Sequence, residues 1–175
     1  MIYKIRVILD TKEDVFRDIE LRDKQTLFTL YKGIVSAFSL QGEELASFYL
    51  SDREWSQGKE IPLEDMGESE EDETMADFQI NEVLPNIGDR MIFVYDYMEM
   101  WTFYVEVLEV ADKKAVFNYP LTTYRYGSMP LKAPKRNMDI LNLEDDEMID
   151  DDDDDTSFDE LDIDSELSDE IDDDF

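Results

Sequence analysis

Three residues of the chain, Arg17, Asp96 and Trp101, form the first group whose side chains could carry out chemistry. Arg17 lies in a segment with the alternating pattern of a strand, and Asp96 lies at the end of another such segment. A guanidinium and a carboxylate in these positions can form a charge-assisted, partly buried pair, over which an indole can stack. Such a group could bind a ligand carboxylate. The sequence favours a structural ion pair that fixes the turn between two strands, because no pattern places the three residues in a cleft.

Carboxylates are the second group, and their abundance removes their diagnostic value. Among 47 Asp and Glu residues many close pairs are unavoidable, so spacing cannot identify the two carboxylates of a glycosidase-type site. The chain has no histidine and no cysteine, and so lacks the usual general base at neutral pH, the commonest transition-metal ligand and a thiolate nucleophile. We therefore expect no catalytic residue and no cofactor, and keep a carboxylate-based enzyme as an alternative.

A run of six aspartates, residues 150–155, raises the question of a calcium site. An EF-hand loop needs the pattern D-x-[DN]-x-[DN]-G and a later bidentate glutamate. Residues 150–155 and the following acidic residues 159–164 lack the glycine and the spacing. We expect weak, diffuse binding of divalent cations and no specific metal site.

Residues 139–175 differ from the rest of the chain in charge. They carry 21 carboxylates and no lysine or arginine, so they contribute −21 of the net charge of −31 and leave −10 for residues 1–138. A segment with so many charges buries too little apolar surface to offset the entropy of ordering, which predicts a disordered acidic tail. The tail would repel polyanions, so we expect no direct nucleic-acid partner and no membrane partner.

Apolar residues interrupt the carboxylates of this acidic tail and could anchor it on a partner: Phe158, Leu161, Leu167 and Ile171. An alternation of acidic and hydrophobic residues is typical of disordered segments that fold on a basic, grooved protein. We therefore expect a basic protein partner, whose identity the sequence does not give. The alternative is a solubilising tail with no specific partner.

The elements that must position the polar group begin with a hairpin and a helix. Apolar residues alternate at 3–9 and again at 15–21, which predicts two paired strands. Thr26 is a suitable N-cap for a helix over residues 27–40, and Gly42 is a suitable residue after its end. The helix has a single apolar stripe, formed by Leu27, Leu30, Tyr31, Ile34, Val35 and Phe38.

Strand signals continue after the helix. β-Branched and aromatic residues predict a short strand at 46–50, the two strongest strands at 91–97 and 102–110, and an edge strand at 115–119. Residues 64–77 contain eight acidic residues and no basic one, which predicts an acidic surface loop. Residues 121–136 show no clear period, which predicts an extended surface segment.

Together these elements predict an α+β fold in a single domain, residues 1–138, followed by the disordered tail 139–175. The domain would consist of the N-terminal hairpin, one long helix packed on a mixed or antiparallel sheet, and two long C-terminal strands. The N-terminus alternates as a strand does and lacks the apolar region of a signal peptide, and no apolar run reaches the ~18 residues of a membrane span. We therefore expect a cytoplasmic protein.

Several separate motifs carry a resemblance to a known family. They are Tyr3-x-Ile5-x-Val7-x-Leu9, Val15-Phe16-Arg17-x-Ile19, Thr26-Leu27-x-x-Leu30, Ala37-Phe38-x-Leu40, Leu45-x-x-Phe48 and Phe93-Val94-Tyr95-Asp96-Tyr97-x-x-x-Trp101-x-Phe103-x-Val105. The chain resembles the Ri-plasmid ORF-3-like proteins, some of which are passenger proteins of bacterial mobile elements. The resemblance covers most of residues 3–110. It implies a shared hydrophobic framework and no established activity.

The sequence departs from the family pattern at polar positions. Met98 and Glu99 stand where the family usually has Gly-Asp, and Phe103 stands where a histidine is common. The Pro-Pro-Glu-Asp and Gly-Gly signature near the family's C-terminus is missing, and the acidic tail is not part of the pattern. The resemblance therefore implies the framework of the family but not a polar site built from those groups.

Three functions are consistent with the sequence. The leading hypothesis is a non-enzymatic interaction module whose folded domain binds a protein and whose tail attracts a basic surface. The second is a regulator linked to mobile elements that mimics nucleic acid and competes for a basic nucleic-acid-binding protein. The third is an enzyme that works through carboxylates, Arg17 and tyrosines.

Overall fold

The computed structural model describes residues 1–67, 72–113, 115–116 and 118–134 of the chain. The chain divides into two units, Met1–Arg136 and Asn137–Phe175, and the architecture below is that of the first unit. The acidic tail lies outside the described residues, and so do its four predicted anchors, Phe158, Leu161, Leu167 and Ile171.

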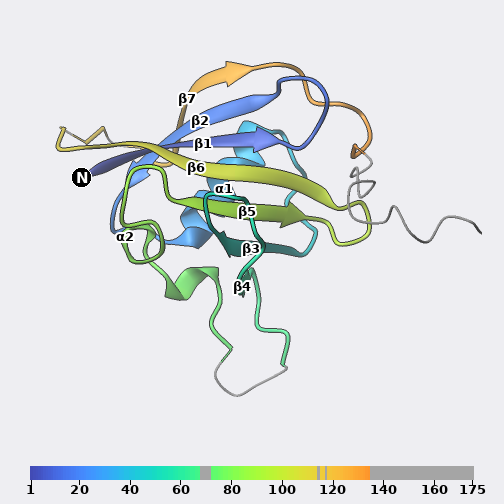
Figure 1. Cartoon of the computed structure of the whole chain (residues 1–175), viewed down its shortest axis with the longest axis horizontal. Helices are drawn as coiled ribbons and strands as arrows, with labels where there is room; N and C mark the ends of the chain where they lie inside the picture. The colour runs from blue at the N-terminus through green and yellow to red at the C-terminus, as the bar shows by residue number, and fades with distance from the viewer. Residues whose placement is uncertain (68–71, 114, 117, 135–175) are drawn as a thin grey trace, which may run out of the picture. The chain divides into compact units, whose positions relative to one another are not determined.

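In the described part of the chain, seven antiparallel strands form one sheet (Figure 1). The strands are β1 (Ile2–Leu9), β2 (Phe16–Arg22), β3 (Ala46–Ser51), β4 (Glu60–Pro62), β5 (Arg90–Tyr95), β6 (Trp101–Ala111) and β7 (Leu121–Tyr126). Their order across the sheet is β4-β3-β5-β6-β1-β2-β7, which makes β4 and β7 the edge strands. The pairing of β1 with β6 joins the N-terminal hairpin β1–β2 to the later hairpin β5–β6.

The predicted α+β class with one long helix is wrong, because the structure is mainly β. The helices of the described residues are α1 (Leu27–Ala37), η1 (Met75–Asp77) and α2 (Ile80–Val83), of 11, 3 and 4 residues. Thr26 caps α1 as predicted, since its hydroxyl accepts a hydrogen bond from the Thr29 amide at 3.3 Å. The helix ends before residue 40 because Ser39 takes a φ of 54°, in the left-handed region. None of these helices is long and apolar enough to cross a membrane.

The strand β7 corrects two further predictions. Residues 115 and 116 are not in a strand, and the edge strand lies instead at Leu121–Tyr126, within the segment predicted to be extended surface. Threonine and tyrosine supply its β propensity. Its side chains are mostly exposed on both faces, so the sequence lacks the alternation of apolar and polar residues by which a half-buried strand is recognised.

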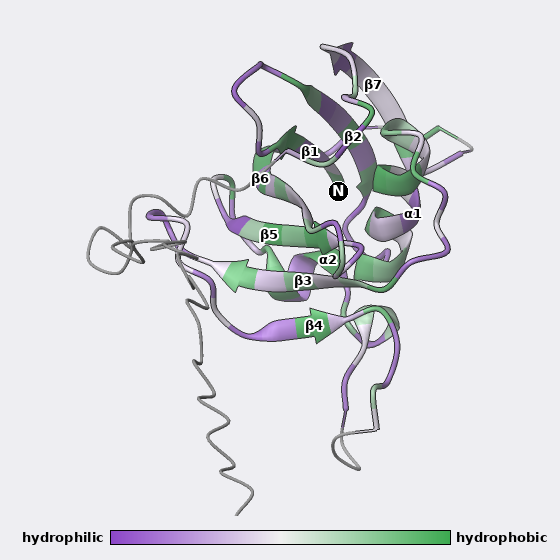
Figure 2. Ribbon diagram, turned by 90° about the vertical axis from the view of Figure 1, so that its right-hand side faces the viewer, coloured by the Kyte–Doolittle hydropathy of each residue, from purple (hydrophilic) through white to green (hydrophobic). Residues whose placement is uncertain are grey.

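One face of the sheet forms the core with the helices (Figure 2). The apolar stripe of α1, including Leu30 and Ile34, is buried in the core, where α1 contacts β2. The rings of Phe48, Phe93 and Phe103 continue this core across β3, β5 and β6. Burial of these alternate positions determines which side chains face the opposite side.

The short helices η1 and α2 close one end of the core. Met75 and Ile80 are buried there, so part of the predicted acidic loop 64–77 packs on the domain. Backbone hydrogen bonds from Leu27 to Phe78 and from Ile80 to Gln25 fix the segment beside the start of α1.

Candidate functional site

The three residues of the predicted polar group have separate partners. Arg17 lies in β2 and is buried. Its guanidinium donates hydrogen bonds to the backbone carbonyls of Phe16 (2.8 Å), Ala37 (3.2 Å), Tyr126 (2.7 Å) and Gly127 (3.0 Å). The ring that it contacts is Phe38, 5.0 Å from guanidinium carbon to ring centroid. Within the described residues, no hydrogen bond, ion pair or ring contact joins Arg17 to Asp96 or Trp101, so the predicted cluster is not assembled.

Arg17 ties β7 and the residue after it to the rest of the domain. Carbonyl dipoles stabilise its charge, and one of them, from Ala37, belongs to the negatively polarised C-terminal end of α1. Gly127 has a φ of 76°, and a Cβ there would lie 2.3 Å from the carbonyl oxygen of Asp14, so only glycine allows this close approach. Burial lowers the pKa of the Arg17 guanidinium, and the charge of Arg125 lowers it further.

Asp96 holds the turn between β5 and β6. Its Oδ1 accepts hydrogen bonds from the amides of Met98 (3.0 Å) and Glu99 (3.3 Å), and its φ of 63° is one that aspartate tolerates better than most residues. Its own amide donates to the Leu45 carbonyl at 2.8 Å. The Asp96 carboxylate therefore fixes a turn through backbone amides rather than through an ion pair.

Trp101 and Phe103 both serve the framework of the sheet. Trp101 begins β6, pairs with Tyr95 and packs partly buried against the core. Phe103 is fully buried, with its ring centroid 4.7 Å from that of Phe38 and 5.7 Å from that of Phe93. An aromatic core residue thus occupies the position at which the resemblance leads one to look for a histidine.

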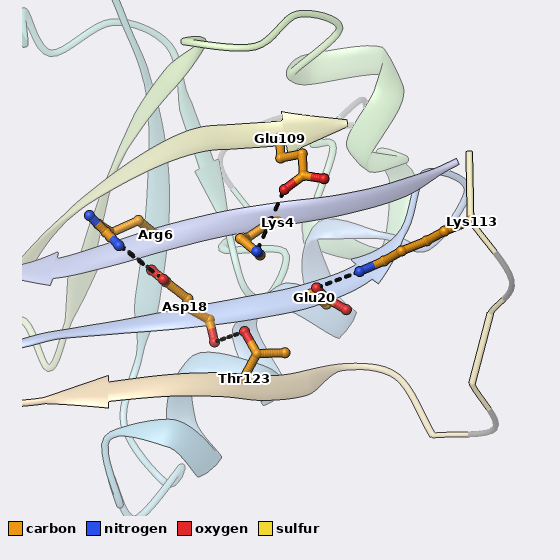
Figure 3. A network of polar contacts seen from close by, with 7 residues as sticks. All are labelled: Lys4, Arg6, Asp18, Glu20, Glu109, Lys113 and Thr123. Carbon is orange, nitrogen blue, oxygen red and sulfur yellow. Dashed lines mark hydrogen bonds and ion pairs between the residues drawn. The ribbon is translucent and has the colours of Figure 1, made fainter. Parts of the chain in front are cut away.

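The strand register places a second set of side chains on the face of the sheet opposite the core, which we call the outer face. Ion pairs link neighbouring chain segments there: Arg6–Asp18 (2.8 Å), Lys113–Glu20 (2.7 Å), Lys4–Glu109 (3.5 Å) and Arg90–Glu106 (3.5 Å). The first three appear in Figure 3. The Arg6 pair is bidentate, and this hydrogen bonding raises the pKa of the guanidinium. Charged groups on the outer face are therefore held in defined positions.

Aromatic rings extend the outer face to the edge strand β7. The guanidinium carbon of Arg6 lies 4.3 Å from the ring centroid of Phe16. Phe16 in turn stacks on Tyr124 and Tyr126, with centroids 5.8 Å and 5.3 Å away. The two tyrosines are 51% and 49% exposed, so they present an aromatic surface next to the cation–π contact of Arg6 with Phe16.

A second group of rings lies on the outer face at β5 and β6. The connection from β3 to β4 carries Trp55, whose ring centroid is 4.9 Å from that of Tyr104 and 4.6 Å from the guanidinium carbon of Arg90. Gly58 permits this connection to fold closely, because a Cβ at Gly58 would lie 2.7 Å from the Leu50 carbonyl oxygen. Trp55 and Arg90 thus repeat the aromatic–guanidinium contact made by Phe16 and Arg6.

A pocket of about 340 Å³ lies beside the edge strand β4. The described residues that line it are Lys59, Glu60, Pro62, Met66, Asp72, Glu73 and Tyr97. Next to it, the fully buried Ser47 donates a hydrogen bond to Glu60 Oε1 at 2.7 Å, and its Oγ contacts the Tyr97 hydroxyl. Burial raises the pKa of this hydroxyl. We call this cavity the Tyr97 pocket.

The described side chains at these positions offer aromatic and charged contacts. In the part of the chain that the structure describes, no group of three or more Asp, Glu, His or Cys residues could hold a metal ion. The outer face offers rings and paired charges, and the Tyr97 pocket offers carboxylates and a hydroxyl.

Comparison with protein families establishes the relationship of the chain. The profile of the family described as plasmid pRiA4b ORF-3-like protein matches residues 1–132. The chain belongs to this family. The match confirms the resemblance carried by the sequence motifs, and it spans the sheet from β1 to β7.

The fold of this plasmid pRiA4b ORF-3-like protein also occurs in a solved structure. The chain is similar to the protein of unknown function MM3350 from Methanosarcina mazei Go1, with a TM-score of 0.58 and 16% sequence identity. The likeness covers 71% of this chain and 68% of that chain. At this identity it shows the fold and says nothing of activity. No curated protein matched the chain.

The residues of the outer face and of the Tyr97 pocket were missed by sequence reasoning. The sequence did contain a signal for the outer face. Lys4 and Arg6 are two residues apart in β1, and Asp18 and Glu20 are two residues apart in β2, which is the pattern of opposite charges paired on one face of a hairpin. No comparable signal marks the pocket, because Glu60, Tyr97 and the adjacent Ser47 come from three separate parts of the chain.

Proposed function

We propose that the protein is a non-enzymatic interaction module that binds a basic protein partner through the outer face of its sheet. The observation that carries the proposal is the concentration of aromatic and guanidinium side chains on that face, in the groups Arg6–Phe16–Tyr126 and Arg90–Trp55–Tyr104. Tyrosine, tryptophan and arginine are the residues that contribute most binding energy at protein interfaces. Their contacts with one another hold them in place before binding, which lowers the entropic cost of association.

Charge supports a basic partner. Residues 1–138 have a net charge of −10, and the acidic tail adds −21. A polyanionic tail attracts a basic surface over long distances and increases the association rate, while the outer face determines which basic protein stays bound. The tail thus supplies attraction, and the sheet supplies selectivity.

Affinity capture from a bacterial lysate at about 0.05 M and about 0.5 M salt tests the proposal, because the higher salt screens the tail. The informative variant replaces Tyr124 and Tyr126 together with serine. A control variant, Phe28→Ser, removes an aromatic ring of α1 that is 37% exposed. We expect the double variant to bind a captured partner about tenfold or more weakly and the control to bind it normally.

Two outcomes would contradict the proposal. Equal binding by the double variant and the parent would show that Tyr124 and Tyr126 on the outer face do not contribute to partner binding. Capture limited to nucleic-acid-binding proteins, lost completely at the higher salt, would favour the alternative in which the protein mimics nucleic acid. Unchanged melting temperatures of both variants are required before either conclusion is drawn.

A further inference from the structure

The Tyr97 pocket has the dimensions and walls of a site for one side chain. Its volume of about 340 Å³ lies at the lower end of the range for ligand pockets. Pro62, Met66 and the Tyr97 ring contribute apolar surface of the kind against which a methylene chain packs. Met66 is 51% exposed and unbranched, so it can adapt to what enters.

Glu60 is a carboxylate of the pocket that is bonded to a fully buried side chain. Ser47 is fully buried in β3 and bonds one oxygen of the Glu60 carboxylate at 2.7 Å. The same Ser47 Oγ contacts the Tyr97 hydroxyl, so a strand residue connects the carboxylate to the hydroxyl. A carboxylate positioned in this way binds a cation with little further loss of side-chain entropy.

The charges around the pocket are unbalanced. Among the described residues, three carboxylates line it, from Glu60, Asp72 and Glu73, and one ammonium group, that of Lys59. Lys59 is already used, because it forms an ion pair with Glu73 at 3.0 Å and lies 5.3 Å from the ring centroid of Phe78. Because Lys59 is paired with Glu73, the Glu60 carboxylate retains a negative charge that a ligand with one positive charge would reduce.

We propose that the Tyr97 pocket binds the cationic side chain of an arginine or lysine in an extended segment of a protein partner. The methylene chain packs against Pro62, Met66 and the Tyr97 ring, and the cationic end is bound by the Glu60 carboxylate. This inference rests on the proposed function, because it names the group of a basic partner that the domain recognises. It places that recognition at edge strand β4, at the opposite end of the sheet from Tyr124 and Tyr126.

The test uses the full chain and a hexapeptide with capped ends whose only charged residue is a central arginine, beside the same peptide with lysine and with citrulline, the uncharged analogue of arginine. Binding is measured at about 0.15 M salt by NMR, from the Met66 methyl signal and the Tyr97 amide signal. We expect the two cationic peptides to shift both signals. The citrulline peptide should bind about tenfold or more weakly, since the bond to a charged donor is lost.

The matched variants are Glu60→Gln, Tyr97→Phe and Asp173→Asn. The first and third each remove one negative charge, one from the pocket and one from the acidic tail. We expect Glu60→Gln to weaken binding of the arginine peptide about tenfold or more, and Asp173→Asn to change it less than about twofold. Equal effects of these two variants would show general attraction to a polyanion and would overturn the proposal. Tyr97→Phe keeps the ring, so it should weaken binding less than Glu60→Gln.

The outcomes separate this inference from the proposed function. Peptides that leave the Met66 and Tyr97 signals unshifted overturn the pocket, while capture of a basic protein that depends on Tyr124 and Tyr126 would still support the outer face. Conversely, a pocket that selects the cationic peptides in a chain that captures no basic protein supports the site and overturns the proposed function.

Discussion

Replacing Arg17 with methionine tests how β7 is held to the domain. Methionine keeps an unbranched apolar chain but removes the four hydrogen bonds from the guanidinium to backbone carbonyls. The carbonyl of the buried Ala37 then loses the donor that it has in the structure, whereas that of the exposed Gly127 can be hydrated. An unsatisfied buried acceptor costs roughly 1–3 kcal/mol, and the lost charge-assisted bonds add to this.

The removal of a buried charge acts in the opposite direction. Transfer of a cation out of water is costly, and Arg17 has carbonyl dipoles rather than a carboxylate as partners, so methionine recovers part of the loss. We therefore expect the free energy of unfolding to fall by about 2–4 kcal/mol. The free energy of unfolding of Arg17→Lys should lie between those of the parent and the methionine variant, because an ammonium group retains the charge but not the planar set of donors.

Urea unfolding followed by tryptophan fluorescence measures these changes. Arg125→Met is the matched control, because Arg125 pairs with Arg17 in the register of β2 and β7 and is exposed. It should be neutral or slightly stabilising, since the charge of Arg125 acts against that of Arg17. Hydrogen exchange should show the amides of β7 opening first in Arg17→Met. A methionine variant as stable as the parent, with β7 equally protected, would refute the reasoning.

Three further predictions concern the core residue Phe38, the acidic tail and three tyrosines with raised pKa. Phe38→Ala should lower the free energy of unfolding by about 3–5 kcal/mol, because Phe38 is 2% exposed and lies in the core, and a change below about 1 kcal/mol in urea unfolding would contradict this. Truncation after Arg136 should leave the calorimetric melting temperature unchanged or slightly raised by relieving like-charge repulsion, and a large fall would show that the tail contributes to the folded domain. Burial raises the pKa of Tyr3, Tyr31 and Tyr97, so the stability that they contribute is complete below the ordinary tyrosine pKa and is lost as the pH rises through the raised values. Urea unfolding at about pH 8 and about pH 10.5 should therefore show lower stability at the higher pH, and equal stability would contradict the assignment.

Local patterns predicted those parts of the fold in which one face of an element is buried. Alternation at residues 3–9 and 15–21 identified β1 and β2, and Thr26 marked the start of α1. The end of α1 and the overall class were predicted wrongly. Phe38 continues the apolar stripe in the sequence, but it is the C-cap of α1, and Ser39 has left the helical conformation. The apolar stripe therefore predicts which residues are buried, but not the residue at which the helix ends.

The polar contacts could not be predicted, because they depend on strand pairing between distant residues. Arg17 and Gly127 are separated by 110 positions, and their hydrogen bond exists only because β7 pairs with β2. A strand arginine has the same local signature whether its guanidinium meets a carboxylate or carbonyl groups. Sequence reasoning therefore recognised Arg17 as a chemically notable residue and assigned it the wrong partner.

The turn between β5 and β6 links the framework to the Tyr97 pocket. Asp96 uses its carboxylate to bind the amides of Met98 and Glu99, and it fixes the turn against Leu45, the residue that precedes β3. Tyr97, the next residue in the chain, is thereby held beside Ser47 in β3, where its hydroxyl reaches the buried serine. Met98, Glu99 and Phe103 differ from the family pattern, but the turn still positions Tyr97. With Phe103 in the core and Asp96 bound to backbone amides, the side chain that the turn directs toward a cavity is Tyr97, on which the proposed recognition of a cationic side chain depends.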